Sequence, residues 1–573
     1  MREKIREIIS GALRKASAEA GWNLPDFPSV EVEIPREKSH GDFATNLAMT
    51  LAKPLKSNPR KIAEALRGAV LASVPELVES VEIAGPGFLN FRLKKSGWLS
   101  VVDRAVAEGK AYGWTNTGGD KKVLLEFVSA NPTGPLHVGH ARIAAVGDAL
   151  ARLLSSAGYA VTKEFYVNDT GLQMQLLARS ILVRYQQHLG REAVLPEDHY
   201  QGEYVKELAA RIAKEEGEKY LKMPEAVALE ELGQRGCALL LAAIREDLAA
   251  FGLVFDTYYS EKNLYKEKLV EQALQELQEK NFLEEKDKAL WFRSTNFGDE
   301  KDRVVRRENG VHTYFASDIA YHRDKYKRGF DLLIDIWGAD HHGYIPRVKA
   351  AITALGLDAE LLKVQLVQFV NLLRGGERVA MGKRSGTFDT LRDLIDEVGT
   401  DAARFIFLLR SADSTLDFDL DLAKKKTLEN PVFYVQYAHA RIHSFFAKAR
   451  EVGLSVDVAA PLDPTKLVAD EEIALAREIS RLPEVIAACA RGLEPHLLPH
   501  YLLDLARTFH SYYTARDEAG APRFKAVDAA APEVSRARLK LAWAVALVLR
   551  NGLECLGVSA PERMESAEAG TAD

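Results

Sequence analysis

The sequence predicts a multidomain α/β protein: a Rossmann-like parallel-sheet domain with a helical insertion, an N-terminal α/β module and a C-terminal all-α helical bundle. Three observations predict this fold class. Apolar, β-prone stretches alternate with helical spacing between residues 121 and 415, a charge-rich helical stretch interrupts them, and all-helical character begins at about residue 420. We place the domains at residues 1–112, 113–415 (insertion about 180–285) and 416–564, with a disordered tail at 565–573.

Composition and charge indicate which classes of protein this sequence can belong to. A hydrophobic content of 47% and a charged content of 28% are typical of globular proteins. The net charge of −6 argues against wholesale wrapping of nucleic acid, although it leaves room for a local basic face. The three cysteines lie far apart, which argues against a zinc site and fits a reducing compartment. With no apolar segment near the ~20 residues that span a bilayer, we expect a cytoplasmic monomer with no membrane or DNA partner.

The N-terminal module is predicted from a short alternation of elements. A helix near residues 3–20 precedes a strand at 30–34 and a turn at 39–41 that leads into a helix at Asn46. Residues 80–93 indicate two strands around a Gly-Pro-Gly turn. For His40, Asp42 and Phe88 we favour turn formation and core packing over ligand contacts.

The most informative stretch joins a strand at residues 123–128 to a helix at 143–154. Prolines and glycines between them forbid regular structure, so His137 and His140 lie three apart on the first turn of that helix. Free backbone N–H groups and the helix dipole favour an anionic phosphate there, and Gly139 leaves room for a flat base. The pattern indicates a nucleotide site whose imidazoles donate to a phosphate. The competing interpretation is two histidines that cap or pack a helix start.

Two further strands end in polar turns, where open parallel sheets bind ligands. The strand at 161–167 precedes a turn that either binds a ligand or caps a helix, and the sheet is expected to resume near 289. The strand at 331–337 leads to His341 and His342, which would point apart on a tight turn. We therefore favour a ligand-contacting role over a metal site. Tyr314 and Asp318 share one face of a helix.

The remaining stretches add a basic loop and a helical bundle. Residues 378–386 form a basic, glycine-punctuated loop that can close over a triphosphate, ahead of a helix at 391–398. Residues 424–441 combine lysines with tyrosines suited to stacking on single-stranded bases, although aromatic packing inside a bundle is the better account of most of them. Helices at 501–513 and 536–553 complete the bundle.

Several of these motifs resemble one family. His137-Val-Gly-His140 is similar to the His-Ile-Gly-His signature of class I aminoacyl-tRNA synthetases, and residues 126–140 resemble bacterial arginyl-tRNA synthetases in particular. The basic loop resembles the family's Lys-Met-Ser-Lys-Ser loop, with Ala380 in place of the first lysine and Gly382 in place of the serine. The outer domains resemble the family's tRNA-elbow extension and anticodon-binding bundle, so the resemblance covers essentially the whole chain.

The resemblance implies an activity and a set of site residues. Arginine and ATP, with Mg²⁺, would form arginyl-adenylate, and the arginyl group would pass to tRNA(Arg). The implied catalytic residues are His137, His140 and Lys383. Gly139, Met381 and Arg384 would join them in binding ATP. The implied arginine-binding residues are Glu126, Ser129, Asn131, Tyr314, Asp318 and His342, and the implied tRNA-binding residues are Tyr434, Gln436, Tyr437 and Arg441.

Alternatives remain at this point. Glu126 could serve in a structural ion pair at the strand end. The chain could be a catalytically silent, synthetase-like tRNA-binding protein, for which Ala380 is the support, or another His-x-Gly-His nucleotidyltransferase that makes a small-molecule adenylate.

Overall fold

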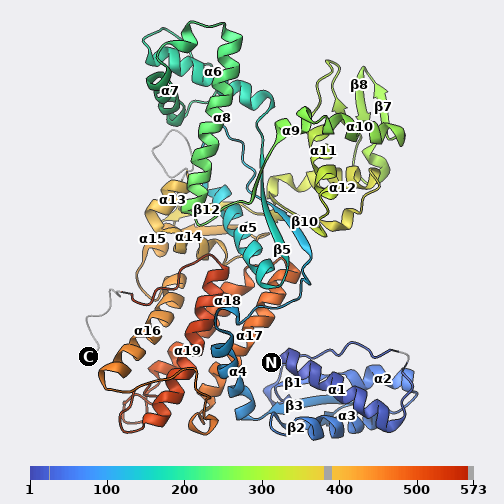
Figure 1. The fold of residues 1–573 in the computed structure, drawn as a ribbon, viewed down its shortest axis with the longest axis vertical. Coiled ribbons are helices and arrows are strands. Elements are labelled where there is room, and N and C mark those ends of the chain that lie inside the picture. The colour runs from blue at the N-terminus through green and yellow to red at the C-terminus, as the bar shows by residue number, and fades with distance from the viewer. Residues whose placement is uncertain (25, 380–389, 565–573) are drawn as a thin grey trace.

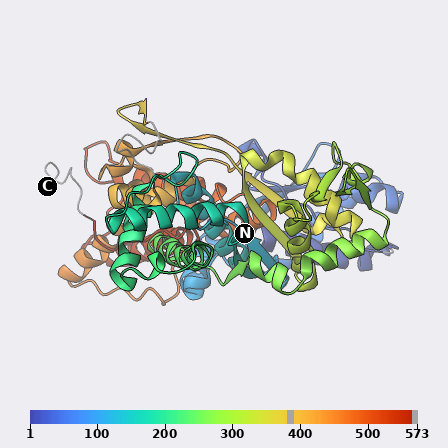
Figure 2. The same cartoon turned by 90° about the horizontal axis from the view of Figure 1, so that it is seen from above.

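The computed structural model describes residues 1–24, 26–379 and 390–564. A central sheet carries two lobes above it, a helical bundle below it and an N-terminal module to one side (Figure 1). The two lobes also stand apart in the view from above (Figure 2).

The N-terminal module packs helices on one antiparallel sheet of order β1-β3-β2. The Gly-Pro-Gly turn joins β2 to β3 as predicted. The predicted strand at 30–34 was wrong, because this segment makes only one β-bridge, between Glu33 and Ala44. Side chains take its carbonyls instead: Arg6 Nε donates to Val30 and Thr45 Oγ1 to Glu31. The elements are α1 (Arg2–Ala20), β1 (Phe43–Thr45), α2 (Leu47–Leu55), α3 (Pro59–Ser73), β2 (Val78–Ala84), β3 (Phe88–Leu93) and the connecting α4 (Lys95–Glu108).

The central sheet is parallel and has the order β11-β10-β4-β5-β6. From β4 the chain first adds strands on one side and later on the other, so a topological switch point lies between β4 and β10. Helix α5 (Val138–Ser156) packs closely on this sheet, since a Cβ at Gly147 would lie 2.2 Å from the Phe127 ring. The strands are β4 (Lys122–Glu126), β5 (Ala160–Val167), β6 (Thr257–Ser260), β10 (Leu332–Gly338) and β11 (Leu362–Val367).

The two lobes are inserted between strands of this sheet. The helical lobe contains α6 (Gly171–His188), α7 (Glu203–Glu216) and α8 (Glu225–Ala250) around a core of its own. The second lobe contains α9 (Glu261–Lys266), α10 (Leu269–Glu279), α11 (Tyr314–Lys327), α12 (Ile345–Ala354) and an antiparallel sheet of β7 (Leu283–Lys286), β8 (Ala289–Phe292) and β9 (Arg303–Arg306).

The expectation that the central sheet resumes near residue 289 was therefore wrong. Strand β8 pairs with β7 and β9, not with the central sheet. The turn explains the local pairing: Asp287 and Lys288 have φ of 52° and 58°, and two positive φ values favour a tight hairpin. The central sheet instead gains β6, which lies inside the stretch predicted as a helical insertion.

The rest of the chain forms a small three-stranded sheet with short helices, and then the predicted bundle. The first group is β12 (Val370–Arg374), β13 (Glu377–Arg378), α13 (Leu391–Val398), α14 (Thr400–Phe407), β14 (Leu416–Asp419) and α15 (Leu420–Lys424). The bundle is α16 (Pro431–Glu451), α17 (Asp470–Gly492), α18 (Leu497–Thr514) and α19 (Pro532–Cys555). None of the helices in the described ranges has the length and apolar character needed to cross a bilayer.

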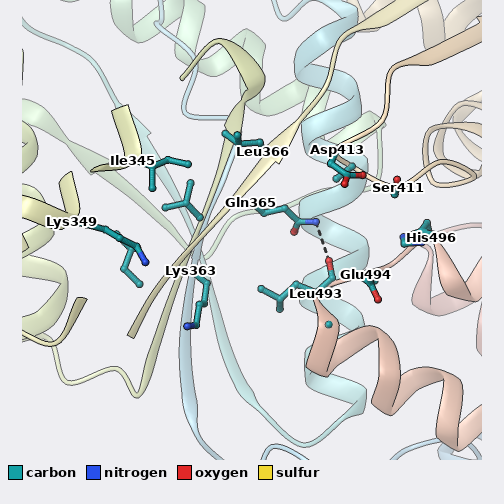
Figure 3. Close-up of a pocket in the computed structure, with 14 residues that line it drawn as sticks. Ile345, Lys349, Lys363, Gln365, Leu366, Ser411, Asp413, Leu493, Glu494 and His496 are labelled. Atoms are coloured by element: carbon teal, nitrogen blue, oxygen red, sulfur yellow. Dashed lines mark hydrogen bonds between the residues drawn. The ribbon is translucent and has the colours of Figure 1, made fainter. Parts of the chain in front are cut away.

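Buried polar contacts join the bundle to the sheet domain. Arg404 on α14 is fully buried, donates to Asp148 on α5 at 2.6 Å and to the carbonyl of Leu556 just beyond α19. At the sheet edge, Gln365 on β11 donates to the Leu493 carbonyl at 2.9 Å across a cleft of about 730 Å³ (Figure 3). The bundle is thus connected to the helix that begins at the His137 turn.

Candidate active site

A cleft of about 750 Å³ opens at the carboxyl ends of the central strands, at the switch point. It brings together half of the residues implied for nucleotide and arginine binding: His137, Gly139, His140, Ser129, Asn131 and Tyr314. Its lining comprises residues 128–131, His137, Gly139, His140, Ile143, Asn168, Thr170, Gln173, Tyr314, Gly338, Asp340, His341 and residues 367–370.

The two histidines cap the helix that starts in the cleft. His137 is the N-cap of α5, and its Nδ1 accepts from the Gly139 N–H at 3.1 Å. His140 Nδ1 accepts in turn from the backbone N–H of His137 at 3.3 Å. The rings stack with centroids 3.7 Å apart. A Cβ at Gly139 would lie 2.9 Å from His137 Cε1, so glycine is needed for this arrangement.

These hydrogen bonds fix what the imidazoles offer to a ligand. Burial and the neighbouring His137 lower the pKa of His140 to about 3, so His140 is neutral near pH 7. Because each Nδ1 accepts a backbone hydrogen bond, the neutral tautomer carries its proton on Nε2. Capping and ligand binding are therefore compatible in His140, where Nδ1 accepts the backbone N–H of His137 and Nε2 carries a proton that can be donated to a ligand.

The turn before the histidines is strained. Val128 and Ser129 have φ of 68° and 40°, values that non-glycine residues rarely adopt. Ser129 Oγ donates to Glu126 Oε1 at 2.8 Å and accepts from the Tyr166 N–H at 3.1 Å. These contacts hold the Ser129 backbone and the exposed Asn131 side chain at the cleft wall.

Glu126 lies behind that wall in a buried ion pair. Its Oε2 accepts from Lys325 Nζ, which is itself 0% exposed and also donates to Asp335 at 2.7 Å. His322 Nε2 lies 3.0 Å from the other oxygen of Asp335. Both oxygens of Glu126 are engaged within the protein, which corresponds to the structural ion pair that the sequence left open.

The half-buried Asp318 and the buried Glu261 are carboxylates of a different kind. Within the described ranges neither forms an ion pair with lysine or arginine, and Oε2 of the 2%-exposed Glu261 has no hydrogen-bond partner. Burial raises the pKa of both carboxyls, although Tyr344 donates to Asp318, and Thr170 and Ser317 donate to Glu261. The negative charge of Asp318 also raises the pKa of Glu261. Among the described residues, the two carboxylates thus form an anionic site with no lysine or arginine paired to it.

This pair lies just behind the cleft. Asp318 follows Tyr314 by one turn of α11, and Thr170, which donates to Glu261, lines the cleft beside Tyr314. Tyr314 is 53% exposed, and its hydroxyl lies 3.2 Å from the position of a Cβ at Gly171. Of the two adjacent histidines, His341 lines the cleft, whereas the exposed His342 does not.

Most of the basic loop lies outside the described part of the chain. Ala380, Met381, Lys383 and Arg384 lie outside the described residues. Where the chain is described again, Thr390 forms a β-bridge with His137, and the Leu391 N–H donates to the Leu136 carbonyl at 2.8 Å.

Comparisons with known proteins agree on one family. The family model described as "tRNA synthetases class I (R), catalytic domain" matches residues 101–417. The models "Arginyl tRNA synthetase N terminal domain" and "DALR anticodon binding domain" match residues 3–93 and 435–564. The arginine–tRNA ligase of Syntrophotalea carbinolica is 50% identical over 564 residues, covering 98% of this chain and 100% of the relative.

The chain belongs to the arginyl-tRNA synthetase family. The arginine–tRNA ligase of Bacillus licheniformis is 46% identical over 566 residues, with 98% of this chain and 99% of that one covered. The crystal structure of Thermus thermophilus arginyl-tRNA synthetase has a TM-score of 0.73 at 25% identity and covers 98% of this chain and 100% of that one. The predicted resemblance and fold class are confirmed, and membership excludes the other His-x-Gly-His nucleotidyltransferases.

In this synthetase, the residues predicted to contact tRNA lie on α16 with unequal exposure. Tyr437 stacks on Phe433 with ring centroids 5.9 Å apart, and the Arg441 guanidinium lies 4.8 Å from the Tyr513 ring centre. Tyr434 packs beside His510. Gln436 is 7% exposed, and its Nε2 donates to Asp401 at 2.8 Å and to the Ser559 carbonyl at 2.9 Å. Its side chain therefore links the bundle to α14, and its contact with tRNA stays a prediction.

Sequence reasoning missed Glu261 and Lys325. Glu261 directly follows the four-residue strand β6, so an acid at the carboxyl end of a parallel strand was the available signal. That signal was hidden because β6 itself was not predicted. Lys325 stands in a helix rich in charged residues, where burial leaves no mark in the sequence.

Proposed function

We propose that the synthetase activates L-arginine with ATP and transfers the arginyl group to tRNA(Arg), releasing pyrophosphate and then AMP. The observation that carries this proposal is a pair of carboxylates, the half-buried Asp318 and the buried Glu261, which have no lysine or arginine partner in the described structure. An anionic pair largely shielded from water beside a nucleotide cleft is the environment that a planar guanidinium requires. The arginine–tRNA ligase relatives support the same substrate.

Arginine would lie with its guanidinium towards this pair and its α-amino group near Ser129 and Asn131, which line the cleft. Tyr314 would cover the side chain from the exposed side. Glu126 would not contact the guanidinium. It would instead hold Ser129 in place by accepting a hydrogen bond from the Ser129 hydroxyl. His342 contributes no contact to this arrangement.

The activation step needs positioning and charge stabilisation more than a protein nucleophile. A carboxylate oxygen of arginine attacks the α-phosphorus of ATP. The new P–O bond forms as the bond to the β-phosphate oxygen breaks, which yields arginyl-adenylate and pyrophosphate. The Nε2–H groups of His137 and His140 would donate to the phosphate oxygens, on which charge increases in the transition state. Gly139 would let the adenine approach the backbone.

Lys383, with Met381 and Arg384, is assigned to the β- and γ-phosphates from the sequence motif alone. The described residues contain no group of three His, Cys, Asp or Glu side chains able to hold a metal ion. Mg²⁺ is commonly held through substrate phosphates. We therefore propose that it enters bound to ATP, and we assign it no protein ligand.

In the second step, a hydroxyl of the terminal tRNA ribose attacks the acyl carbon of the adenylate, an ester forms and AMP leaves. The anticodon-binding match and the surface of α16 support tRNA contacts at Tyr434, Tyr437 and Arg441. Cytoplasmic location, the monomeric state and the domain boundaries stay predictions.

The test is aminoacylation of bulk tRNA with each of the twenty amino acids in labelled form. We expect label in tRNA with arginine only. Charging by another amino acid would contradict the substrate assignment. Absence of charging, with tRNA still bound, would support the catalytically silent alternative.

The substitution Glu261→Gln should raise the thermal stability of the free protein and at the same time weaken arginine binding. Because burial raises the pKa of Glu261, its ionisation at neutral pH costs folding free energy that Glu261→Gln removes. We expect the Tm of the free variant to rise by roughly 2 °C at pH 7.5, and the gain to vanish as pH falls towards ~3, where the side chain is protonated in both states. Thermal scans should also show that arginine raises the Tm of the wild type and not of the variant. A lower Tm at pH 7.5 would contradict the uncompensated pair.

A further inference from the structure

One tyrosine of the helical insertion contacts the turn that carries Asn131, at the arginine side of the cleft. Tyr204 lies at the start of α7, and its hydroxyl donates to the Thr133 carbonyl at 2.7 Å. Thr133 belongs to the turn between the strained Ser129 and the His137 cap. It is 7% exposed, and its N–H donates back to the Asn131 carbonyl at 2.7 Å. Tyr204 thus holds the turn that presents Asn131 to the cleft.

The ring is seated between two glycines. A Cβ at Gly134 would lie 3.2 Å from the Tyr204 hydroxyl oxygen, and a Cβ at Gly202 would lie 2.4 Å from the ring. A side chain at either glycine would therefore crowd the space that the Tyr204 ring occupies. Burial raises the pKa of Tyr204 well above its ordinary value, so the hydroxyl keeps its proton and remains a donor.

The segment that carries Tyr204 is itself fastened to the insertion. Tyr200 donates to Gln173, which lines the cleft from α6, and the Tyr200 N–H donates to Ser180 Oγ at 3.1 Å. The hydrogen bonds of Tyr200 to α6 and of Tyr204 to Thr133 therefore connect the helical insertion to the turn that carries Asn131. Neither Tyr200 nor Tyr204 lines the cleft itself.

We propose that Tyr204 is a positioning residue of the arginine subsite, through which the helical insertion holds the Asn131 turn in its arginine-binding form. The inference rests on the proposed function, because it assigns the α-amino group of arginine to Asn131. It predicts a selective effect: weakening the link lowers the affinity for arginine and leaves ATP binding intact.

The test is Tyr204→Phe, which keeps the ring and removes the hydrogen bond. In steady-state aminoacylation at saturating tRNA, KM for arginine should rise roughly three- to tenfold, the effect of one lost hydrogen bond, while KM for ATP stays within about twofold. Tyr185→Phe is the matched control. Tyr185 is 0% exposed in the same lobe and its hydroxyl donates to the Gly217 carbonyl, away from the cleft.

Three outcomes would overturn the inference: an unchanged KM for arginine in Tyr204→Phe, an equal rise in Tyr185→Phe, or an equal rise in KM for ATP. The last two would indicate general loosening of the lobe. Failure of the proposed function is distinguishable, because it would appear as absence of arginine charging by the wild type. A Tm measurement on both variants verifies that they are folded at the assay temperature.

Discussion

Replacing Asp318 by asparagine is expected to lower kcat/KM for arginine by roughly 10²- to 10³-fold, because a buried charge pair with the guanidinium loses one partner. KM for ATP should change by less than about twofold, since Asp318 lies one turn beyond Tyr314 on α11 and does not line the cleft that holds His137 and His140. The measurement is steady-state aminoacylation with arginine and ATP varied separately. Asp318→Ala should abolish arginine use and retain ATP binding.

Asp340 provides a matched control for this substitution. It is an acidic residue that lines the same cleft, but its side chain is 65% exposed and lies 3.6 Å from His341. Asp340→Asn should therefore leave kcat/KM for arginine within about threefold, as expected for a solvent-screened charge. Loss of arginine use in Asp340→Asn, or its retention in Asp318→Asn, would move the guanidinium site elsewhere.

Replacing His140 by alanine is expected to lower the rate of adenylate formation by roughly 10²- to 10³-fold, the usual effect of losing one preorganised donor to a transition state. His140→Gln should recover part of the rate because its amide can also donate. Single-turnover adenylate formation at saturating ATP and arginine measures this step. Equal losses in the alanine and glutamine variants would indicate that His140 serves only as a helix cap.

The protonation of His140 gives this prediction a pH signature. Its pKa is lowered to about 3 by burial and by His137, so the ring is already neutral at pH 6. Raising the pH from about 6 to 8 therefore removes no proton from it, and the rate of the chemical step should not fall through the ordinary histidine pKa of ~6.5. A fall in that interval would point to an imidazolium in the reaction.

Much of the fold could be predicted because its signals are local. Strands β4 and β10 are mostly apolar runs that lead into polar turns, and the bundle helices have regular spacing. The pairing partner of a short strand is not a local property, which is why β8 was assigned to the wrong sheet. The strand predicted at residues 30–34 was wrong for a related reason. Arg2 and Arg6 on α1 donate to the carbonyls of Val32 and Val30, which a neighbouring strand would otherwise use.

The site shows the same division between local and distant information. The histidine cap could be predicted because strand, turn and helix are contiguous in the chain. The roles of two acidic residues could not be predicted in this way. Glu126 ends strand β4 and Glu261 directly follows strand β6, but only Glu126 meets a buried lysine, Lys325, that comes from 199 residues away. Sequence carries no sign of that difference, although it decides which carboxylate remains available to a substrate.

The most direct test of the account is ATP–pyrophosphate exchange, measured with each of the twenty amino acids in the presence and absence of tRNA. The account predicts exchange with arginine alone, appearing when tRNA is added, and its loss in Asp318→Asn. Exchange with a different amino acid, or no exchange with arginine under either condition while tRNA still binds, would contradict it.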